Sequence, residues 1–589
     1  MILSILIYAI FVGCSLAALI LLGYKPRTEI NHVFEQYRRS AALRRTVTAW
    51  FFVLGLVFVV VQTLRWPFFK YVFYQLVHLA SHHSSIWEPI HAIGLFVLVV
   101  AEMLVMTHWF IYVFYSWRAT HKYRLPPTLP LGENSPEILV MIACCDEDPE
   151  ILERSLGTVT KLDYPNYRAY MIENSRTKEN KAACTAVAER LGVEVLHIPN
   201  RGHKAGALND ALPHLKRSAK YIAVFDVDHE IKPETLRELA PLLEQDSGLA
   251  FVQTPQLYAN AEETWTTRAA AMQEMLLYDS VLEAKGASEQ ALCCGSNFLM
   301  RIDALESVGG WDEQTVSEDL MTSFWLHKKG WRSLYHRKTY AVGIGPSTVY
   351  GYWKQQQRWA TGNTSVAKIV WKNMWSKERA PFRMSINYLW SSGYYFITLA
   401  LGYLATVPML LLLFVRFGMG GAEWYLQHAM RPIDYVYLSV YPLYVAVALF
   451  PYVHMRLRGY AIRNLVLLQG LLANTVPVYV ASVLRGLWRD EKFFQIAPKK
   501  AMNLHRAFWK TPQSYIFAAL VVVGGLLFHM TRTENVATFV YILLFWTFVY
   551  TLSFAHFFIF TLESRRVVAQ ERAEALARIN HDQAQPARS

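Results

Sequence analysis

The chain has 589 residues, of which 53% are hydrophobic and 18% are charged. This composition is too apolar for an ordinary soluble protein and is typical of a chain that combines membrane helices with a globular part. The net charge of +12 fits either basic loops beside membrane helices or an anionic substrate, and the lack of a recognisable binding module argues against nucleic acid as a partner.

Three apolar stretches, at residues 1–24, 46–69 and 87–117, precede the more polar middle of the chain. Each is long enough to cross a bilayer, which requires about 20 apolar residues in a helix. The first lacks a basic leader and a clear cleavage site, so we interpret it as an anchor and not as a signal peptide. Lys and Arg are abundant after the first and third stretches and nearly absent after the second. The positive-inside rule therefore predicts an external N-terminus and a cytoplasmic region at 118–380.

This cytoplasmic region alternates strand-like and helix-like patterns, which predicts a mostly parallel, doubly wound α/β sheet. Sheets of this kind bind ligands beyond the carboxyl ends of their strands. The expected strands are 138–144, 167–173, 193–198 and 221–225, and the expected helices include 149–162 and 180–191.

Two aspartates, Asp226 and Asp228, follow the apolar run YIAVF at the expected end of a strand. Two carboxylates so spaced can reach one cation, and such oxygen ligands suit Mg²⁺ or Mn²⁺ bound to a diphosphate. The alternative is a solvated turn. Upstream, Lys204 lies on a small-residue turn before a helix, which suits a phosphate but also fits an ordinary helix start.

A second acidic pair, Glu318 and Asp319, follows Ser317 at the start of an expected helix. A carboxylate held there can take a proton from an attacking hydroxyl. The same pattern is also typical of an N-cap followed by acids in the first turn, and both interpretations can hold together.

Further along, the segment from Gln355 to Trp359 places an arginine beside a tryptophan. Arg358 can pair with a phosphate, and Trp359 offers a flat face on which a sugar ring can stack. An aromatic helix at a membrane surface would look the same. Residues 294–297 (CGSN) either line an acceptor path or form a turn.

Four more stretches, 387–415, 435–455, 514–530 and 536–562, are expected to span the membrane. The stretch 464–488 is apolar but has basic flanks and polar residues within it, so we expect it to lie on the cytoplasmic surface. Seven spans then place the C-terminus inside.

At this point the chain resembles a processive family 2 glycosyltransferase of the cellulose synthase or curdlan synthase type, over about residues 125–505. The resemblance depends on five motifs and on a sixth segment, FQIAPK, that is similar to that family's gating loop. The motifs are FDVDH (225–229), FVQTP (251–255), CGSN (294–297), SED (317–319) and QQQRW (355–359).

The resemblance implies roles for individual residues. Asp226 and Asp228 would hold the metal and the diphosphate, Asp319 would be the general base, and Trp359 would stack on the terminal sugar. The resemblance also implies substrate contacts for Lys204, Glu173, His229, Gln355, Arg358, Glu318, Phe494 and Lys499.

Four departures from the family pattern affect these expectations. The motif D-D-G is replaced by Glu173-Asn174-Ser175, which weakens the expectation of uridine recognition, and Ala497 replaces a gating-loop threonine. Three spans precede the catalytic region where cellulose synthases of bacteria typically have four. The stretch after Glu563 is too short for a PilZ domain, so we expect no direct control by cyclic di-GMP on this chain.

The resemblance implies an α/β GT-A domain inserted in a multi-span α-helical membrane domain. The expected parts are 1–117 (three membrane helices), 118–380 (catalytic domain), 381–562 (four membrane helices, a surface helix at 464–488 and a gating loop at 490–505) and 563–589 (cytoplasmic tail).

The function implied is an inverting, processive β-glucan synthase that uses UDP-glucose and Mg²⁺ or Mn²⁺, with β-1,3 or β-1,4 linkages, in a bacterial plasma membrane. Its expected partners are the UDP-sugar, the growing polysaccharide, membrane lipids and periplasmic export proteins. The alternatives are a chitin, hyaluronan or other exopolysaccharide synthase, a non-processive glycolipid glycosyltransferase, or a transporter with a non-catalytic domain.

Overall fold

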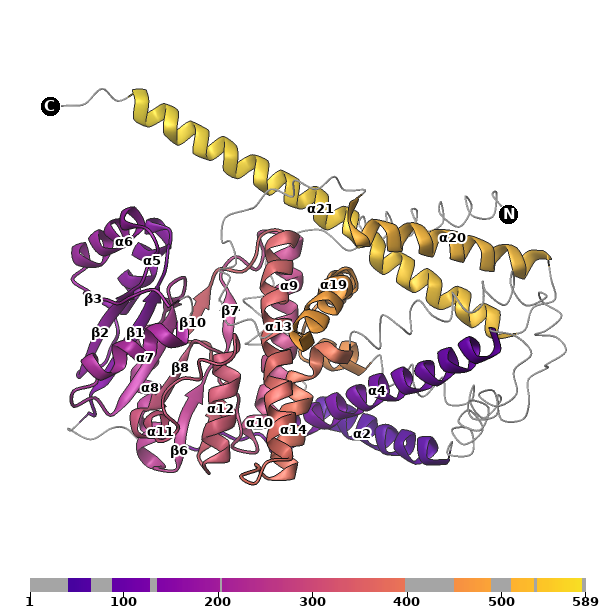
Figure 1. Cartoon of the computed structure of the whole chain (residues 1–589), viewed down its shortest axis with the longest axis horizontal. Helices are drawn as coiled ribbons and strands as arrows, with labels where there is room; N and C mark the ends of the chain where they lie inside the picture. Colours follow the sequence, from indigo (N-terminus) through magenta and orange to yellow (C-terminus); the bar gives the residue numbers. More distant parts are fainter. Residues whose placement is uncertain are drawn as a thin grey trace.

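The computed structural model describes residues 41–64, 87–127, 135–201, 204–397, 450–488, 510–533 and 538–584. The predicted first span and the predicted gating loop, with Phe494 and Lys499, lie outside these residues. Figure 1 shows a sheet domain at one end, the helices α9, α13 and α19 next to it, and the helices α2, α4 and α20 at the other end, from which the long helix α21 runs back toward the sheet domain.

The sheet has seven strands in the order β3-β2-β1-β4-β8-β6-β9. β8 is antiparallel to both of its neighbours, and every other neighbouring pair in this sheet is parallel, which confirms the prediction of a mostly parallel sheet. The strands are β1 (Ile138–Cys144), β2 (Tyr167–Glu173), β3 (Glu194–His197), β4 (Tyr221–Asp226), β6 (Leu249–Gln253), β8 (Phe298–Arg301) and β9 (Arg332–Tyr335).

Helices cover both faces of this sheet, and successive residues of the central strand β1 enter different cores. Val140 and Ile142 pack with residues of α5, α6 and α8, whereas Leu139 and Met141 pack with residues of α7, α11 and α12. A strand buried on both faces must be apolar at every position, which explains the continuous run ILVMIAC. The helices are α5 (Pro149–Val159), α6 (Lys178–Arg190), α7 (Lys204–Leu215), α8 (Thr235–Gln245), α11 (Ile302–Ser307) and α12 (Glu318–Lys328).

A small second sheet, β5-β10-β7, lies beside the end of β4. It joins β5 (Glu230–Ile231), β7 (Gln256–Tyr258) and β10 (Ala341–Gly343), so it fixes the chain directly after Asp228. A Cβ at position 343 would lie 2.7 Å from His229 Nε2, and only glycine lets the imidazole pack this closely.

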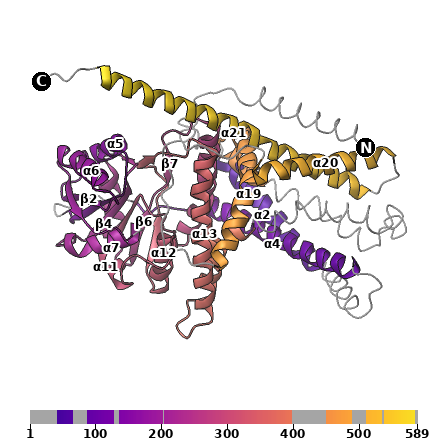
Figure 2. The ribbon, with the colours of Figure 1, turned by 45° about the horizontal axis from the view of Figure 1, so that its top comes forward.

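A layer of helices connects the sheet domain to the apolar helices. α9 (Trp265–Leu276) continues through a π-helical segment, η2 (Leu277–Leu282), into α10 (Glu283–Gly286). α13 (Val349–Met374) runs beside α19 (Ile462–Trp488), and Figure 2 shows the same pairing from a second direction. The short α14 (Phe382–Ser392) follows α13.

In the described part of the chain, three helices are long and apolar enough to cross a membrane: α19, α20 (Pro512–Thr533) and the apolar half of α21 (Thr538–Ala584). The predicted spans at 46–69 and 87–117 correspond to the helices α2 (Ala41–Leu64) and α4 (Trp87–Lys122), and their crossing of a membrane stays a prediction. The predicted surface position of 464–488 is likewise untested. α21 continues as helix well into the predicted tail.

Candidate active site

A cavity of about 940 Å³ lies at the carboxyl ends of the central strands. At one end it is lined by residues that follow β1, β2 and β4, such as Cys145, Asn174 and Asp226. At the other end it reaches α4, α14 and the helical segment 450–457, through residues such as His108 and Trp390. One continuous space therefore joins the strand ends to the apolar helices.

Asp226, Asp228 and His229 form a cluster at the end of β4. One ligand atom from each residue lies within 4.8 Å of the other two. The backbone bends because His229 N donates a hydrogen bond to Asp226 O (3.0 Å), and Ser296 Oγ accepts a hydrogen bond from Asp226 N (2.7 Å). The sequence identified both carboxylates but missed the imidazole as a third potential ligand.

This cluster fits a divalent cation of the Mg²⁺ or Mn²⁺ kind. Two carboxylates and one imidazole are suitable donors for Mn²⁺, and the carboxylates alone suit Mg²⁺ with substrate phosphates completing the shell. The Nδ1 atom of His229 is buried, lies 3.4 Å from Asp228 Oδ1 and makes no hydrogen bond in the described part of the chain. A buried imidazole nitrogen beside two carboxylates is the arrangement that a shared cation would satisfy.

Lys204, the first residue of α7, reaches across to the same cluster. Its Nζ atom donates to Asp226 Oδ1 (2.5 Å) and to the carbonyl oxygen of Gly295 (2.7 Å). Burial alone would raise the pKa of the Asp226 carboxyl, but the charge of Lys204 outweighs this effect and holds that pKa below its usual value. Asp226 is therefore ionised at neutral pH.

Glu318 and Asp319 form the first turn of α12. Leu320 N donates to Asp319 Oδ1 (2.7 Å), whereas the side chain of Ser317 makes no capping hydrogen bond to the helix. Burial raises the pKa of Glu318 to about 8 and that of Asp319 to about 6. Since a general base works best when its pKa lies near the working pH, Asp319 has suitable acid–base properties.

The loop that carries Gly295 lies against Asp319. Gly295 has φ of +80°, a left-handed conformation, and a Cβ at this position would lie 3.1 Å from Asp319 Oδ2. A side chain here would be strained and would crowd the carboxylate. This explains the glycine of the CGSN motif and places the neighbouring Cys294 on the cavity wall.

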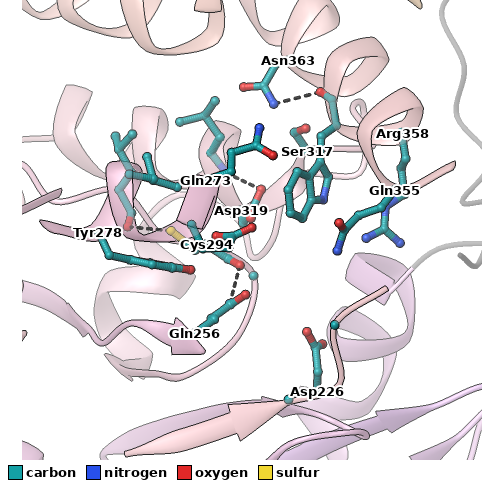
Figure 3. A pocket seen from close by; sticks show the side chains of 18 of the residues that line it. Asp226, Gln256, Gln273, Tyr278, Cys294, Ser317, Asp319, Gln355, Arg358 and Asn363 are labelled. Atoms are coloured by element: carbon teal, nitrogen blue, oxygen red, sulfur yellow. Dashed lines mark hydrogen bonds between the residues drawn. The ribbon is translucent and has the colours of Figure 1, made fainter. Parts of the chain in front are cut away.

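Gln355, Arg358 and Trp359 line the cavity from one face of α13, as expected for residues three and four positions apart in a helix. Burial lowers the pKa of the Arg358 guanidinium, and the negative charges of the two acidic pairs oppose this effect. The pairs are Asp226 with Asp228 and Glu318 with Asp319, so the cation lies near all four carboxylates. Figure 3 shows Gln355 and Arg358 on the opposite side of the pocket from Asp319 and Cys294.

Gln356 has a different role from its two neighbours in the motif. It is fully buried, and its Oε1 accepts a hydrogen bond from the Tyr479 hydroxyl of α19 (2.7 Å). A Cβ at Gly362 would lie 2.3 Å from Ser317 Oγ, so this glycine lets α13 approach the start of α12. α13 is thereby held against both α12 and α19.

The structure brings together nine of the twelve residues for which the sequence predicted a role at the site. These cavity-lining residues are Lys204, Asp226, Asp228, His229, Glu318, Asp319, Gln355, Arg358 and Trp359.

Glu173 lies behind the cavity wall and not on it. It is fully buried, its Oε1 accepts a hydrogen bond from Ser175 N (2.9 Å), and its Oε2 lies 3.5 Å from His197 Nδ1. The expectation of a direct substrate contact is not met by this geometry. Glu173 instead shapes the loop that brings Asn174 to the cavity.

Sequence reasoning missed two groups on the cavity wall. Beyond the strand ends, Asn200 Nδ2 donates to Asn174 O (2.5 Å), and the available signal was that Asn174 comes directly after β2 and Asn200 three residues after β3. On α9, Glu274 is buried and its pKa is raised to about 7, and it accepts a long hydrogen bond from the Tyr258 hydroxyl (3.4 Å). A glutamate in the mostly apolar run AAAMQEMLL was the signal for this second group.

Two family models match this part of the chain. A model described as glycosyltransferase like family 2 matches residues 136–362, and a model of cellulose synthase matches residues 262–489.

Three curated relatives illustrate the range of similar proteins. Glucomannan 4-beta-mannosyltransferase 1 of Oryza sativa subsp. japonica is 30% identical over 264 residues, which cover 42% of this chain and 50% of that protein. A cellulose synthase catalytic subunit (UDP-forming) of Xanthomonas axonopodis pv. citri is 28% identical, covering 42% and 34%. Beta-monoglucosyldiacylglycerol synthase of a Nostoc species is 27% identical, covering 48% and 59%.

The chain therefore spans between about a third and three fifths of the length of these relatives. The matched regions contain the acidic cluster after β4, the start of α12 and the cavity face of α13. The two matches together cover residues 136–489, and over this part the chain is similar to family 2 glycosyltransferases of the cellulose synthase type.

Proposed function

We propose that this protein is a membrane-bound, processive glycosyltransferase that builds a β-glucan from UDP-glucose and passes the growing chain through its apolar helices. The observation that supports this most strongly is the continuity of the cavity. The same space that holds the carboxylates reaches Trp390, Tyr452 and Leu472 among the apolar helices. A site that released a short product to the cytoplasm would not need such an extension.

In the proposed reaction, Asp319 accepts the proton of the acceptor hydroxyl. The hydroxyl oxygen forms a bond to C1 of the donor sugar while the bond from C1 to the diphosphate oxygen breaks, and UDP leaves with the electron pair. A single displacement of this kind inverts the configuration at C1. The raised pKa of Asp319 supports its assignment as the base, because this carboxylate is a stronger base than an exposed aspartate and is still mostly ionised at neutral pH.

At the donor end, positive side chains would bind the diphosphate. Lys204 and Arg358 both line the cavity beside the acidic pair, and Arg358 would pair with phosphate oxygens. Asp226 and Asp228, with His229, would hold Mg²⁺ or Mn²⁺, which supplies positive charge that stabilises the departing diphosphate. Phe494 and Lys499 would close over the nucleotide if residues 490–505 form a gating loop.

The identity of the donor sugar and the type of linkage are the most specific parts of this proposal. β-1,3 and β-1,4 glucan synthesis are both consistent with the departures at Glu173-Asn174-Ser175 and Ala497. The similarity to mannosyltransferases makes a mannosyl donor a competing proposal. We place the protein in a bacterial plasma membrane, with the lipids, the growing polysaccharide and periplasmic export proteins as its partners.

A second candidate is a glycolipid synthase, which the similarity to beta-monoglucosyldiacylglycerol synthase favours. The test supplies the purified full-length protein separately with labelled UDP-glucose, UDP-N-acetylglucosamine and GDP-mannose. We expect nucleotide release and a long polymer with UDP-glucose, with its linkage read by methylation analysis. A product of one or two sugars on a lipid would overturn the processive assignment, and polymer from another donor would overturn glucose.

A further inference from the structure

A second, smaller cavity of about 260 Å³ lies away from the active site, at the ends of the apolar helices. It is formed where the start of α2, the end of α4, α10 and the end of the segment 450–457 meet. Of the described residues that line it, five are arginines and one, Glu283, carries a carboxylate. The arginines are Arg44, Arg45, Arg124, Arg337 and Arg458.

Two carboxylates at or beside this cavity, those of Glu283 and Asp279, are engaged by its most buried arginine, Arg458. Arg458 is buried, and its Nη2 atom lies 2.9 Å from Glu283 Oε2 while its Nη1 atom lies 3.5 Å from Asp279 Oδ2. Asp279 also accepts a hydrogen bond from the Tyr460 hydroxyl (2.8 Å). Among the described residues that line the cavity, five carry a positive charge and one carries a negative charge, so this wall attracts an anion.

The arginines are arranged at two depths. Arg458 forms the buried end, whereas Arg45, Arg124 and Arg337 are exposed at the rim. Arg337 is further held near the cavity because its guanidinium lies over the Tyr123 ring at 5.8 Å. Planar guanidinium groups bind phosphate oxygens in pairs, so a set converging on one small cavity suits a phosphate group.

The surroundings of the cavity indicate where this phosphate comes from. α2 and α4 pack side by side, with the Phe52 and Trp117 rings stacked at 4.9 Å. After its two arginines, α2 exposes Trp50 and then a series of aliphatic side chains, Val53, Leu56, Val57 and Val60. A succession of basic, aromatic and aliphatic residues is typical of a helix that enters a membrane from the cytoplasmic side. Basic pockets between helices at that level bind lipid headgroups.

We propose that this cavity, which we call the arginine pocket, binds the phosphate of an anionic membrane phospholipid. The pocket joins α2 and α4 to the catalytic region, because Glu283 lies in the helix that continues from α9 and η2. Those elements line the active site through Glu274 and Tyr278. A lipid bound here would stabilise the contact between the membrane helices and the wall of the acceptor path.

The test measures thermal unfolding of the full-length protein in neutral detergent, titrated with dioleoyl phosphatidylglycerol, dioleoyl phosphatidylcholine or inorganic phosphate. The pocket variant combines Arg45→Gln with Arg124→Gln, two exposed rim residues whose loss removes no buried contact. The matched control combines Arg565→Gln with Arg566→Gln, an exposed pair on α21 outside the pocket. A pair of Arg→Lys changes at 45 and 124 keeps the charge and checks that the fold is intact.

We expect phosphatidylglycerol to raise the unfolding temperature of the wild type and of the control variant at the same concentrations. The pocket variant should need roughly tenfold more lipid, since each basic residue contributes noticeably to binding at an anionic surface. Equal stabilisation by phosphatidylcholine, or an unchanged titration of the pocket variant, would overturn the proposal. Equal stabilisation by inorganic phosphate would show a soluble anion site and overturn the assignment to a lipid.

Discussion

At the scale of single residues, the protonation states of Glu318 and Asp319 determine which of the two can act as a base. Asp319 has a pKa raised to about 6 and Glu318 one raised to about 8, both by burial in the first place. At pH 7 Asp319 is therefore mostly ionised, whereas Glu318 is mostly protonated. Of these two neighbours, only Asp319 can act as a base under those conditions.

We predict that the rate falls as the pH is lowered through about 6, because protonated Asp319 no longer accepts the acceptor proton. Asp319→Asn should lower the rate by about 10²- to 10⁴-fold and remove this acid limb, while nucleotide binding survives. Glu318→Gln replaces a group that is already neutral, so the acid limb should stay. Initial rates between pH 5 and 9 and nucleotide titrations measure these outcomes.

An acid limb that stays in Asp319→Asn and disappears in Glu318→Gln would assign the base to Glu318. An unchanged rate in Asp319→Asn at pH 7, together with a large loss in Glu318→Gln, would contradict the assignment of the base.

The acidic cluster after β4 gives a second prediction. Asp226→Ala or Asp228→Ala should lower the rate by at least about 10²-fold, because each removes a ligand for the cation beside the diphosphate. EDTA should abolish synthesis, and Mg²⁺ or Mn²⁺ should restore it. The control is Asp303→Ala, an exposed acid on α11, which should leave the rate unchanged. Full activity in EDTA would remove the metal from the proposal.

Short motifs predicted residues that line the cavity where a strand or helix end fixes the side chain. Asp226 is the last residue of β4 and Asp319 lies in the first turn of α12, so their positions follow from local structure. Glu173 could not be placed, because whether the last residue of a strand faces the cavity or the core depends on the loop after it. Glu274 was missed because it reaches the cavity wall only through the packing of α9 against elements that are distant in the sequence.

At the scale of elements, α13 is the helix that connects the two ends of the cavity. Trp359 packs in a cluster with Tyr394 and Tyr395, beside α14. Trp390 of α14 stacks on the Tyr115 ring of α4 at 4.7 Å. Both tryptophans also line the cavity, so each can contribute a flat face for sugar rings.

We predict different effects for these two tryptophans. Trp359→Ala should abolish polymer while nucleotide affinity stays within a few-fold, because loss of position at the reacting hydroxyl is costly. Trp390→Ala should give shorter chains with little change in nucleotide binding. Calorimetric titration measures the nucleotide, and gel filtration measures chain length.

Trp375→Ala is the matched control for both, because Trp375 lies exposed at the end of α13 outside the cavity. Normal polymer from Trp359→Ala would exclude an acceptor platform at this position. Normal polymer from Trp390→Ala would leave its ring with a packing role alone.

The sequence predicted the elements of the first half of the sheet nearly residue by residue. Continuous apolar runs mark β1 and β4, since strands buried on both faces must be apolar throughout. The strands β5, β7 and β10 have two or three residues each, which is too short for a periodic pattern. The π-helical segment η2 could not be predicted either, because its sequence is compatible with an ordinary α-helix.

At the scale of the whole molecule, the position of α19 decides how many times the chain crosses the membrane. α19 runs along α13: Tyr479 contacts Gln356, and twelve residues further along α13 Lys368 Nζ donates to the carbonyl oxygen of Gly486 (3.1 Å). α13 carries the segment from Gln355 to Trp359 and belongs to the cytoplasmic side in the predicted topology. A helix in contact with it over this length is expected to share that side, although α19 is apolar enough to cross a membrane.

We therefore predict that α19 lies on the cytoplasmic surface, that the chain crosses the membrane seven times, and that its two ends lie on opposite sides. The basic residues after the spans place the N-terminus outside and the C-terminus inside. Reporter fusions at Met1 and Ser589, one active only outside and one only in the cytoplasm, measure this directly. A fusion after Trp488 should report the cytoplasm, because a surface helix begins and ends on one side.

Ends on the same side, with an external signal after Trp488, would mean that α19 crosses the membrane. The contact between α13 and α19 would then have to lie within the bilayer, where the buried Gln356 would need its hydrogen bond from Tyr479 to avoid the cost of an unsatisfied amide.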